Sequence, residues 1–164
     1  MYQHILLAVP LQRWQEYSPH ALAARDAAVA IAKGSGAQLS VLSVYDYDNV
    51  SDPGLSAEMA ARYREDLMLR TDSEMETKMK AFLAGIQGHD LQITPLLKTG
   101  EPRKMILTMI ELLHPDLLVI GSHSKRSVLD VILGGTAAYL LRHASCSVIM
   151  VQPKGEKSTS STTD

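Results

Sequence analysis

Five short apolar runs, each separated from the next by a longer segment, constrain the fold of this chain more than any other feature. Continuous apolar runs of four to eight residues are typical of strands buried on both faces, and strands that alternate with helices require crossover connections. The sequence therefore predicts an α/β fold. We expect a five-stranded parallel, doubly wound (Rossmann-like) sheet with helices on both faces, in three α/β/α layers. The predicted strands are Ile5–Val9, Leu39–Val44, Leu91–Leu97, Leu117–Ile120 and Val148–Val151.

Local start and stop signals place the helices between these runs. Ser18-Pro19 supplies a capping side chain and a residue suited to the first turn, and Gly34-Ser35-Gly36 ends the alanine-rich helix that follows. Residues 56–86 are predicted to form one long helix, or two joined near residues 70–73. A later helix is expected to start near Pro102, and the final helix is expected to end near His143. The apolar residues of the long helix are expected to pack in the core: Met59, Tyr63, Leu67, Met75, Met79, Phe82 and Ile86.

Length and composition narrow the class of protein. The chain has 164 residues, which suits one domain over residues 1–151 followed by a disordered Ser/Thr-rich tail over residues 152–164. Its one cysteine, Cys146, has no partner for an internal disulfide and is expected to be a packed thiol, which favours a cytoplasmic location. A net charge of −2 gives no footprint for nucleic acid, and no apolar run is long enough to predict a membrane span.

The loops after Val9, Val44 and Ile120 form the predicted binding region, because ligands of parallel sheets bind at the carboxyl ends of the strands. The loop after Ile120 is the most informative. Gly121 leaves this strand, and Gly134-Gly135-Thr136 opens the last helix. A glycine-rich helix start after a strand is typical of a phosphate site. A tight turn or a close contact between helix and sheet would also explain Gly134 and Gly135.

The segment from Asp116 to Val151 resembles the C-terminal signature of the universal stress protein family. Gly121 and Gly134 match the first and third glycines of that signature at the family's spacing, and Arg142–Val148 matches its closing run. The apolar run near the N-terminus and the segment Thr99–Pro102 also fit. The resemblance implies a dimer that pairs through the last strand, at Val148, Ile149, Met150 and Val151. One branch of the family binds an adenine nucleotide, so ATP, ADP or AMP with Mg²⁺ is the implied ligand.

Three positions depart from the pattern of the nucleotide-binding branch. Pro10 stands where an Asp is usual, Ser124 replaces the second glycine, and Gly135 replaces a Ser or Thr, with Thr136 beside it as an alternative hydroxyl. A side chain at position 124 narrows the expected phosphate loop. The candidate cofactor-binding residues are nevertheless Val9, Pro10, Val44, Ile120, Gly121, Ser122, His123, Ser124, Gly134, Gly135 and Thr136.

Motifs that would indicate catalysis or metal binding are not found in the sequence. It lacks the G-x-S-x-G nucleophile motif and the Walker A motif, and its six histidines have no metal-ligand spacing, so we predict a protein that is not an enzyme and holds no metal. Two hypotheses remain: a dimeric stress-response regulator that binds an adenine nucleotide, and a dimeric adaptor that binds only protein partners. In the adaptor, the protein's own side chains, such as Trp14, would fill the pocket. A flavin-binding or nucleotidyl-transfer relative of the same architecture is a third, weaker alternative.

Overall fold

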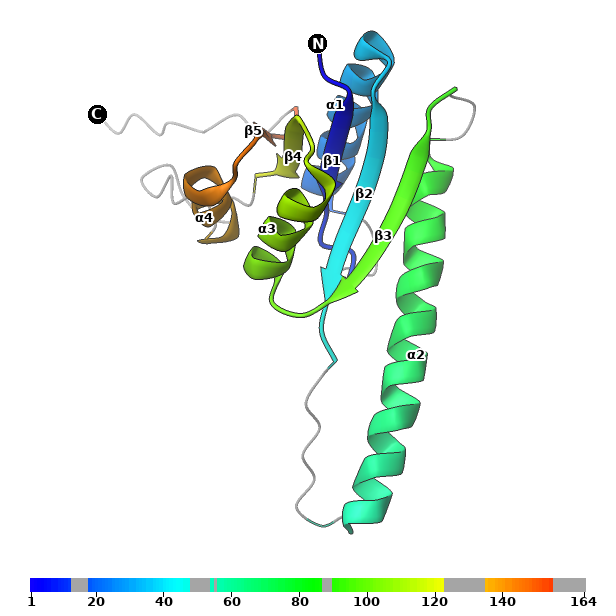
Figure 1. The fold of residues 1–164 in the computed structure, drawn as a ribbon. Coiled ribbons are helices and arrows are strands. Elements are labelled where there is room, and N and C mark those ends of the chain that lie inside the picture. The colour runs from blue at the N-terminus through cyan, green and yellow to red at the C-terminus, as the bar shows by residue number, and fades with distance from the viewer. Residues whose placement is uncertain (13–17, 48–53, 55, 87–89, 123–134, 155–164) are drawn as a thin grey trace, which may run out of the picture.

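The computed structural model describes residues 1–12, 18–47, 54, 56–86, 90–122 and 135–154, and it confirms the predicted alternation of strands and helices (Figure 1). The third strand begins two residues later than predicted and ends at Thr99, and the second includes Tyr45. The strands are β1 (His4–Ala8), β2 (Gln38–Tyr45), β3 (Ile93–Thr99), β4 (Leu117–Gly121) and β5 (Ser147–Val151). The helices are α1 (Pro19–Ser35), α2 (Ala57–Ala84), α3 (Pro102–Leu113) and α4 (Gly135–His143).

The five strands form one parallel sheet in the order β3-β2-β1-β4-β5. The chain first builds the sheet outward from β1 to β3, then crosses to the other side of β1 and builds outward again through β4 and β5. The direction of winding therefore reverses between β1 and β4. In parallel sheets this reversal leaves a crevice at the carboxyl ends of the two strands.

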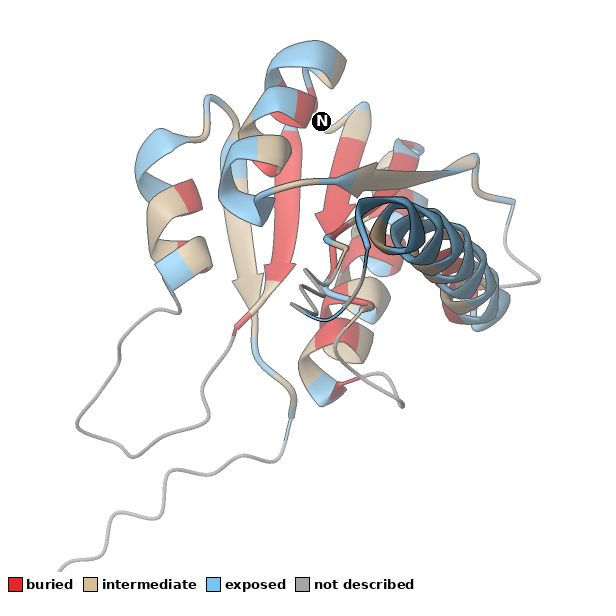
Figure 2. Cartoon of the chain, turned by 90° about the horizontal axis from the view of Figure 1, so that it is seen from below, coloured by how far each residue is buried: buried red, intermediate tan, exposed pale blue. Residues whose placement is uncertain are grey.

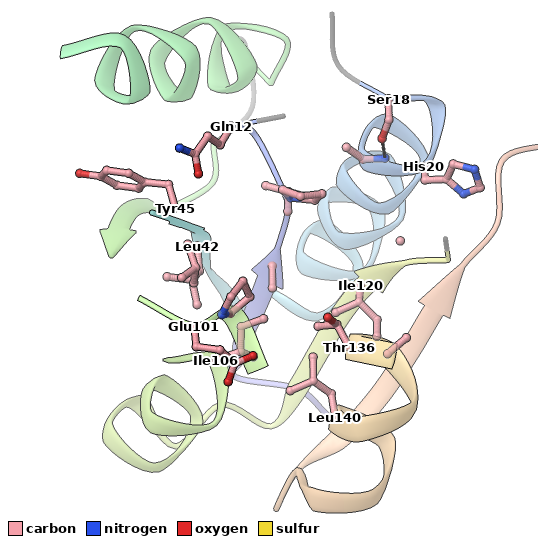
Figure 3. Close-up of a pocket in the computed structure, with 18 of the residues that line it drawn as sticks. Gln12, Ser18, His20, Leu42, Tyr45, Glu101, Ile106, Ile120, Thr136 and Leu140 are labelled. Atoms are coloured by element: carbon pink, nitrogen blue, oxygen red, sulfur yellow. Dashed lines mark hydrogen bonds between the residues drawn. The ribbon is translucent and has the colours of Figure 1, made fainter. Parts of the chain in front are cut away.

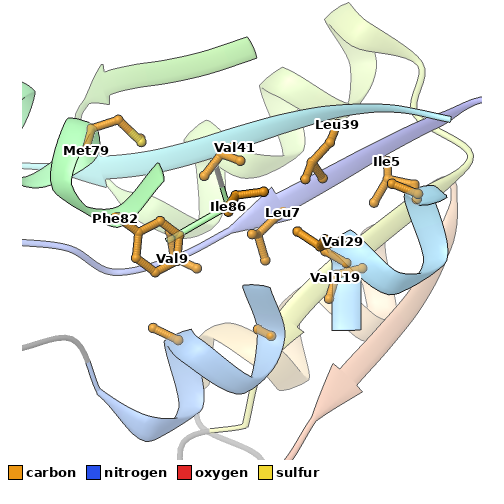
Figure 4. Close-up of a cluster of buried hydrophobic side chains, with 14 of the residues drawn as sticks. Ile5, Leu7, Val9, Val29, Leu39, Val41, Met79, Phe82, Ile86 and Val119 are labelled. Carbon is orange, nitrogen blue, oxygen red and sulfur yellow. The ribbon is translucent and has the colours of Figure 1, made fainter. Parts of the chain in front are cut away.

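Two apolar cores cover the two faces of the sheet. Alternate residues of a strand point to opposite faces, so Ile5 and Leu7 join one core while Leu6 and Ala8 join the other. The first core receives α1 and α2, and Figure 4 shows Phe82 of α2 packed near the central strands. The second core receives α3 and α4. The central strands are buried along their lengths (Figure 2), which explains why each reads as a continuous apolar run.

The ends of α1 confirm the local prediction. The Ser18 hydroxyl accepts the N–H of Ala21 at 3.1 Å, and Pro19 stands at the first helical position. Gly36 follows the helix with a φ of 69°, a left-handed conformation that glycine adopts without steric cost. Helix α1 therefore begins and ends at the residues that the sequence predicted, next to Ser18 and Gly36.

Helix α2 is a single helix of 28 residues, and only part of it packs as predicted. Met75, Met79 and Phe82 are buried, but Met59 is 58% exposed and Tyr63 is 49% exposed. The expectation that all the apolar residues face the core is wrong for two physical reasons. Residues 63 and 75 differ by roughly 120° around a helix with about 100° per residue. The helix is also about 42 Å long at 1.5 Å per residue, and Figure 1 shows it running well past the ends of the strands.

Several predicted features fall outside the described residues. These are Trp14, His123, Ser124, Gly134 and residues 155–164 of the expected tail. Among the helices that the structure describes, none has the length and apolar character needed to span a bilayer.

Candidate functional site

A cavity of about 530 Å³ opens at the carboxyl ends of β1, β2 and β4, at the crevice that the strand order predicts (Figure 3). This volume lies in the range that small-molecule sites occupy. The starts of α1, α3 and α4 complete its walls. Of the eleven residues predicted from sequence, seven line it: Val9, Pro10, Val44, Ile120, Gly121, Gly135 and Thr136.

The remaining four predicted residues lie elsewhere. Ser122 follows β4 but is not part of the cavity wall that the structure describes. It is buried, its hydroxyl lies 3.3 Å from Nδ1 of His20, and its N–H donates to the carbonyl oxygen of Val151. Ser122 therefore joins α1 to the end of β4. His123, Ser124 and Gly134 fall among the residues that are not described.

The deep part of the cavity is apolar. Leu42 of β2, Ile106 of α3, Ile120 of β4 and Leu140 of α4 contribute side chains from four different elements (Figure 3). The sequence does not predict Leu42, Ile106 and Leu140 as site residues, because their place in the site depends on how the helices pack over the strand ends. Such a surface can take the face of a flat apolar ring, whose burial stabilises a bound ligand.

A reciprocal pair of hydrogen bonds links the ends of β1 and β2 at the rim. The Gln12 amide donates to the carbonyl oxygen of Asp46 at 2.6 Å, and the N–H of Asp46 donates to Oε1 of Gln12 at 2.9 Å. Gln12 also offers its own carbonyl oxygen to the Lys78 ammonium at 3.0 Å. These bonds fix the wall that follows Pro10.

Two tyrosines and one carboxylate tie this wall to the long helix. The hydroxyls of Tyr45 and Tyr47 both donate to Oδ1 of Asp72, at 2.6 and 2.7 Å, and the two rings meet edge to face with centroids 5.9 Å apart. Burial, followed by the hydrogen bond to Asp72, raises the pKa of Tyr45, and the hydrogen bond to Asp72 raises the pKa of Tyr47. Both phenols therefore stay protonated donors, and α2 is held against the end of β2.

Gly121 has a packing role that was not predicted from the sequence. A Cβ atom built on this residue would lie 2.8 Å from the carbonyl oxygen of His20, near the start of α1. Such a contact is far inside ordinary van der Waals distance. The glycine is thus required by the approach of α1 to β4, whether or not a ligand is bound.

The opposite wall carries a fixed carboxylate. Glu101 caps α3: its Oε1 accepts the N–H of Arg103 at 3.1 Å and its Oε2 accepts the N–H of Lys104 at 3.2 Å. The Arg103 guanidinium lies 3.8 Å from Oε1 of Glu101 and approaches Gly135 at the start of α4. The sequence signal for this carboxylate was its position directly before Pro102, where capping residues are common.

In the described part of the chain, other reactive side chains form no second site. Among the residues that the structure describes, no three His, Cys, Asp or Glu side chains gather as metal ligands would. Cys146 is partly buried, and this burial raises the pKa of its thiol, so the thiolate form that reacts as a nucleophile is disfavoured.

Comparisons with known proteins agree on one family. The sequence model of the Universal stress protein family matches residues 1–152. The chain is similar to Universal stress protein A homolog 1 of Coxiella burnetii, with 28% identity over 153 residues that cover 93% of this chain and 98% of that one.

Solved structures share the fold. One is a universal stress protein family protein from Arabidopsis thaliana with AMP bound, with a TM-score of 0.62, 18% identity, and coverage of 97% of each chain. Another is a universal stress protein in complex with cAMP, with a TM-score of 0.56, 20% identity, and coverage of 93% of this chain and 98% of that one. Identities this low indicate a shared architecture. Together with the family match over nearly the whole length, they establish that the chain belongs to the universal stress protein family.

Proposed function

We propose that this protein binds an adenine nucleotide in the cavity at the ends of β1, β2 and β4, and that it signals to a protein partner as a homodimer. The cavity carries the proposal. It has the volume of a small-molecule site, an apolar interior at Leu42 and Ile120, and the start of α4 at its rim. An apolar interior suits a purine ring, and helix N–H groups suit a phosphate.

Two observations on relatives support the ligand class. The Arabidopsis thaliana protein that shares this fold was solved with AMP, and another universal stress protein was solved with cAMP. Both ligands combine an adenine ring with one phosphate. Pro10 removes one expected polar contact, but Gln12 and Asp46 supply polar atoms at the same wall. We expect ATP and ADP, with Mg²⁺, to be weaker candidates than the monophosphates.

Isothermal titration with AMP, cAMP, ADP and ATP tests the proposal. Gly135→Glu is the test variant, because it places bulk and a carboxylate at the start of α4, where the phosphate is expected. Leu141→Glu is the matched control, because it adds the same carboxylate to the same helix at a side chain that is 42% exposed. Gly135→Glu should weaken binding by about tenfold or more, a loss of at least about 1.4 kcal/mol, and Leu141→Glu should leave it unchanged.

The adaptor hypothesis predicts the opposite result. If none of the four nucleotides releases or absorbs heat on mixing, and none raises the melting temperature, the cavity is not a nucleotide site. The search for function would then turn to protein partners of the dimer.

The proposed dimer pairs through β5, which lies at one end of the sheet order. In the part of the chain that the structure describes, β5 is bonded to β4 on one side. Val148, Ile149, Met150 and Val151 are each only partly buried. An edge strand of this kind presents unpaired backbone groups, which a second copy can satisfy.

A further inference from the structure

We propose that the Glu101 carboxylate makes this cavity discriminate among adenine nucleotides by phosphate charge, so that a monophosphate binds better than a triphosphate when Mg²⁺ is absent. This inference rests on the proposed function, because it concerns the same cavity. It goes beyond that function by assigning selectivity to one side chain on the wall opposite β1.

Three helices begin at the cavity, and side chains of this chain cap two of them, α1 and α3. At the start of α1 the Ser18 hydroxyl accepts the N–H of Ala21. The start of α3 already holds an internal anion, since Glu101 accepts the N–H groups of Arg103 and Lys104. A second anion at the same N–H groups would meet the first. A phosphate is therefore directed to α4, which begins at Gly135.

Glu101 nevertheless remains close to that phosphate position. It lines the same cavity as Gly135 and Thr136. Figure 3 shows Glu101 reaching from the start of α3 toward the start of α4, where Thr136 lies. Each further phosphate that the ligand carries at this end of the cavity adds repulsion from the carboxylate.

One arginine balances this carboxylate. Arg103 lies 3.8 Å from Glu101, its Nη2 would lie 3.0 Å from a Cβ atom on Gly135, and its guanidinium stands over the Tyr139 ring at 6.0 Å. Arg103 is thus within reach of both Glu101 and a phosphate at α4. Among the cavity-lining residues that the structure describes there is no Lys or Arg, and the carboxylates are Asp46 and Glu101. Shared in this way, Arg103 can offset the charge of one phosphate better than that of three.

The test compares AMP with ATP in wild type and in charge variants. Glu101→Gln keeps the size of the side chain and removes its charge. Glu101→Ser also removes the charge and is a better helix cap, so it guards against loss of the helix start. Glu111→Gln is the matched control, because it removes one exposed carboxylate from the same helix about 15 Å further along at 1.5 Å per residue.

Titration calorimetry in EDTA should give a larger Kd for ATP than for AMP in wild type. The ratio of these two constants should fall about tenfold in both Glu101 variants and stay unchanged in Glu111→Gln. Raising the salt concentration should shrink the effect, because the charges are partly exposed. Mg²⁺ should lower the ratio in wild type more than in the Glu101 variants, because the ion neutralises the phosphates that the carboxylate repels.

The outcomes separate this inference from the proposed function. If both nucleotides bind and the ratio is the same in wild type and both Glu101 variants, the inference is overturned while nucleotide binding stands. If Glu111→Gln changes the ratio as much as Glu101→Gln, net charge rather than Glu101 sets the preference, and the inference is again overturned. If wild type binds neither nucleotide, both the inference and the proposed function fail.

Discussion

The carbonyl oxygen of His20 would lie 2.8 Å from a Cβ atom on Gly121, so this glycine lets the start of α1 approach the end of β4. Gly121→Ala should therefore lower the free energy of unfolding by about 1–3 kcal/mol, the usual cost of overpacking. Gly34→Ala, in α1, is the control, because a Cβ atom there meets nothing within 4 Å. This substitution should stabilise the helix by about 0.5–1 kcal/mol. Urea unfolding without ligand measures both. Equal stability of Gly121→Ala and wild type would show that the backbone contact does not require this glycine.

Asp116 makes the stability of the fold depend on pH, and one substitution at this residue tests that dependence. Its Oδ2 accepts the N–H groups of Gln3 and His4, at 2.7 and 2.8 Å, and these bonds hold the pKa of Asp116 below its ordinary value. A carboxyl group whose pKa is lower in the folded protein stabilises the fold at pH values above its ordinary pKa of about 3.9. This stabilisation is lost as the pH falls through the folded-state pKa. Asp116→Asn should melt lower than wild type at pH 7.

The difference in melting temperature between these two proteins should shrink as pH falls below about 4, because wild type then loses the carboxylate as well. Reading the difference, rather than either curve alone, removes the effect of other titrating carboxyl groups. A difference that stays constant from pH 7 to pH 3 would contradict a role for the Asp116 carboxylate.

The edge strand β5 allows a sharp test of the proposed dimer. Ser147 donates its N–H to Asp116 and Val151 accepts the N–H of Ser122, so alternate residues from 147 to 151 bond β4. The N–H of Met150 must then point to the open side of the sheet. Met150→Pro removes an outward donor while it spares the bonds to β4, so light scattering should report a monomer that still melts cooperatively.

Ile149→Lys should also give monomers, because it places a charge in the proposed interface. Thr94→Lys adds the same charge to an exposed position of β3, at the opposite edge, and should leave the dimer intact. An unaltered dimer in both β5 variants would show that the subunits pair elsewhere.

The parts of the fold that depend on neighbouring residues could be predicted from sequence. Ser18 and Gly36 bound α1 in the sequence and in the structure, because capping is a local interaction. The place of the cavity also followed, since a parallel sheet with this order of elements brings the ends of β1 and β4 together. The exposure of Met59 could not be predicted, because it depends on how far α2 extends past the sheet.

The parts of the site that depend on packing between distant elements could not be predicted from the sequence. The bonds between Gln12 and Asp46 join residues that are 34 positions apart, with no spacing rule to connect them. Glu101 was visible as a residue before Pro102, but its place in the cavity depends on how α3 lies beside α4. Gly121 was predicted as a ligand contact, and its close approach to the backbone of His20 could not be predicted because it depends on how α1 packs against β4.

Amide chemical shifts recorded during titration with AMP test the central claim most directly, because they locate the site as well as detect binding. We predict saturable shifts at the ends of β1, β2 and β4 and at the start of α4, including the amides of Val44, Gly121 and Thr136. The exposed first half of α2 should stay unchanged. Shifts confined to α2, or no shifts up to millimolar AMP, would contradict nucleotide binding in this cavity.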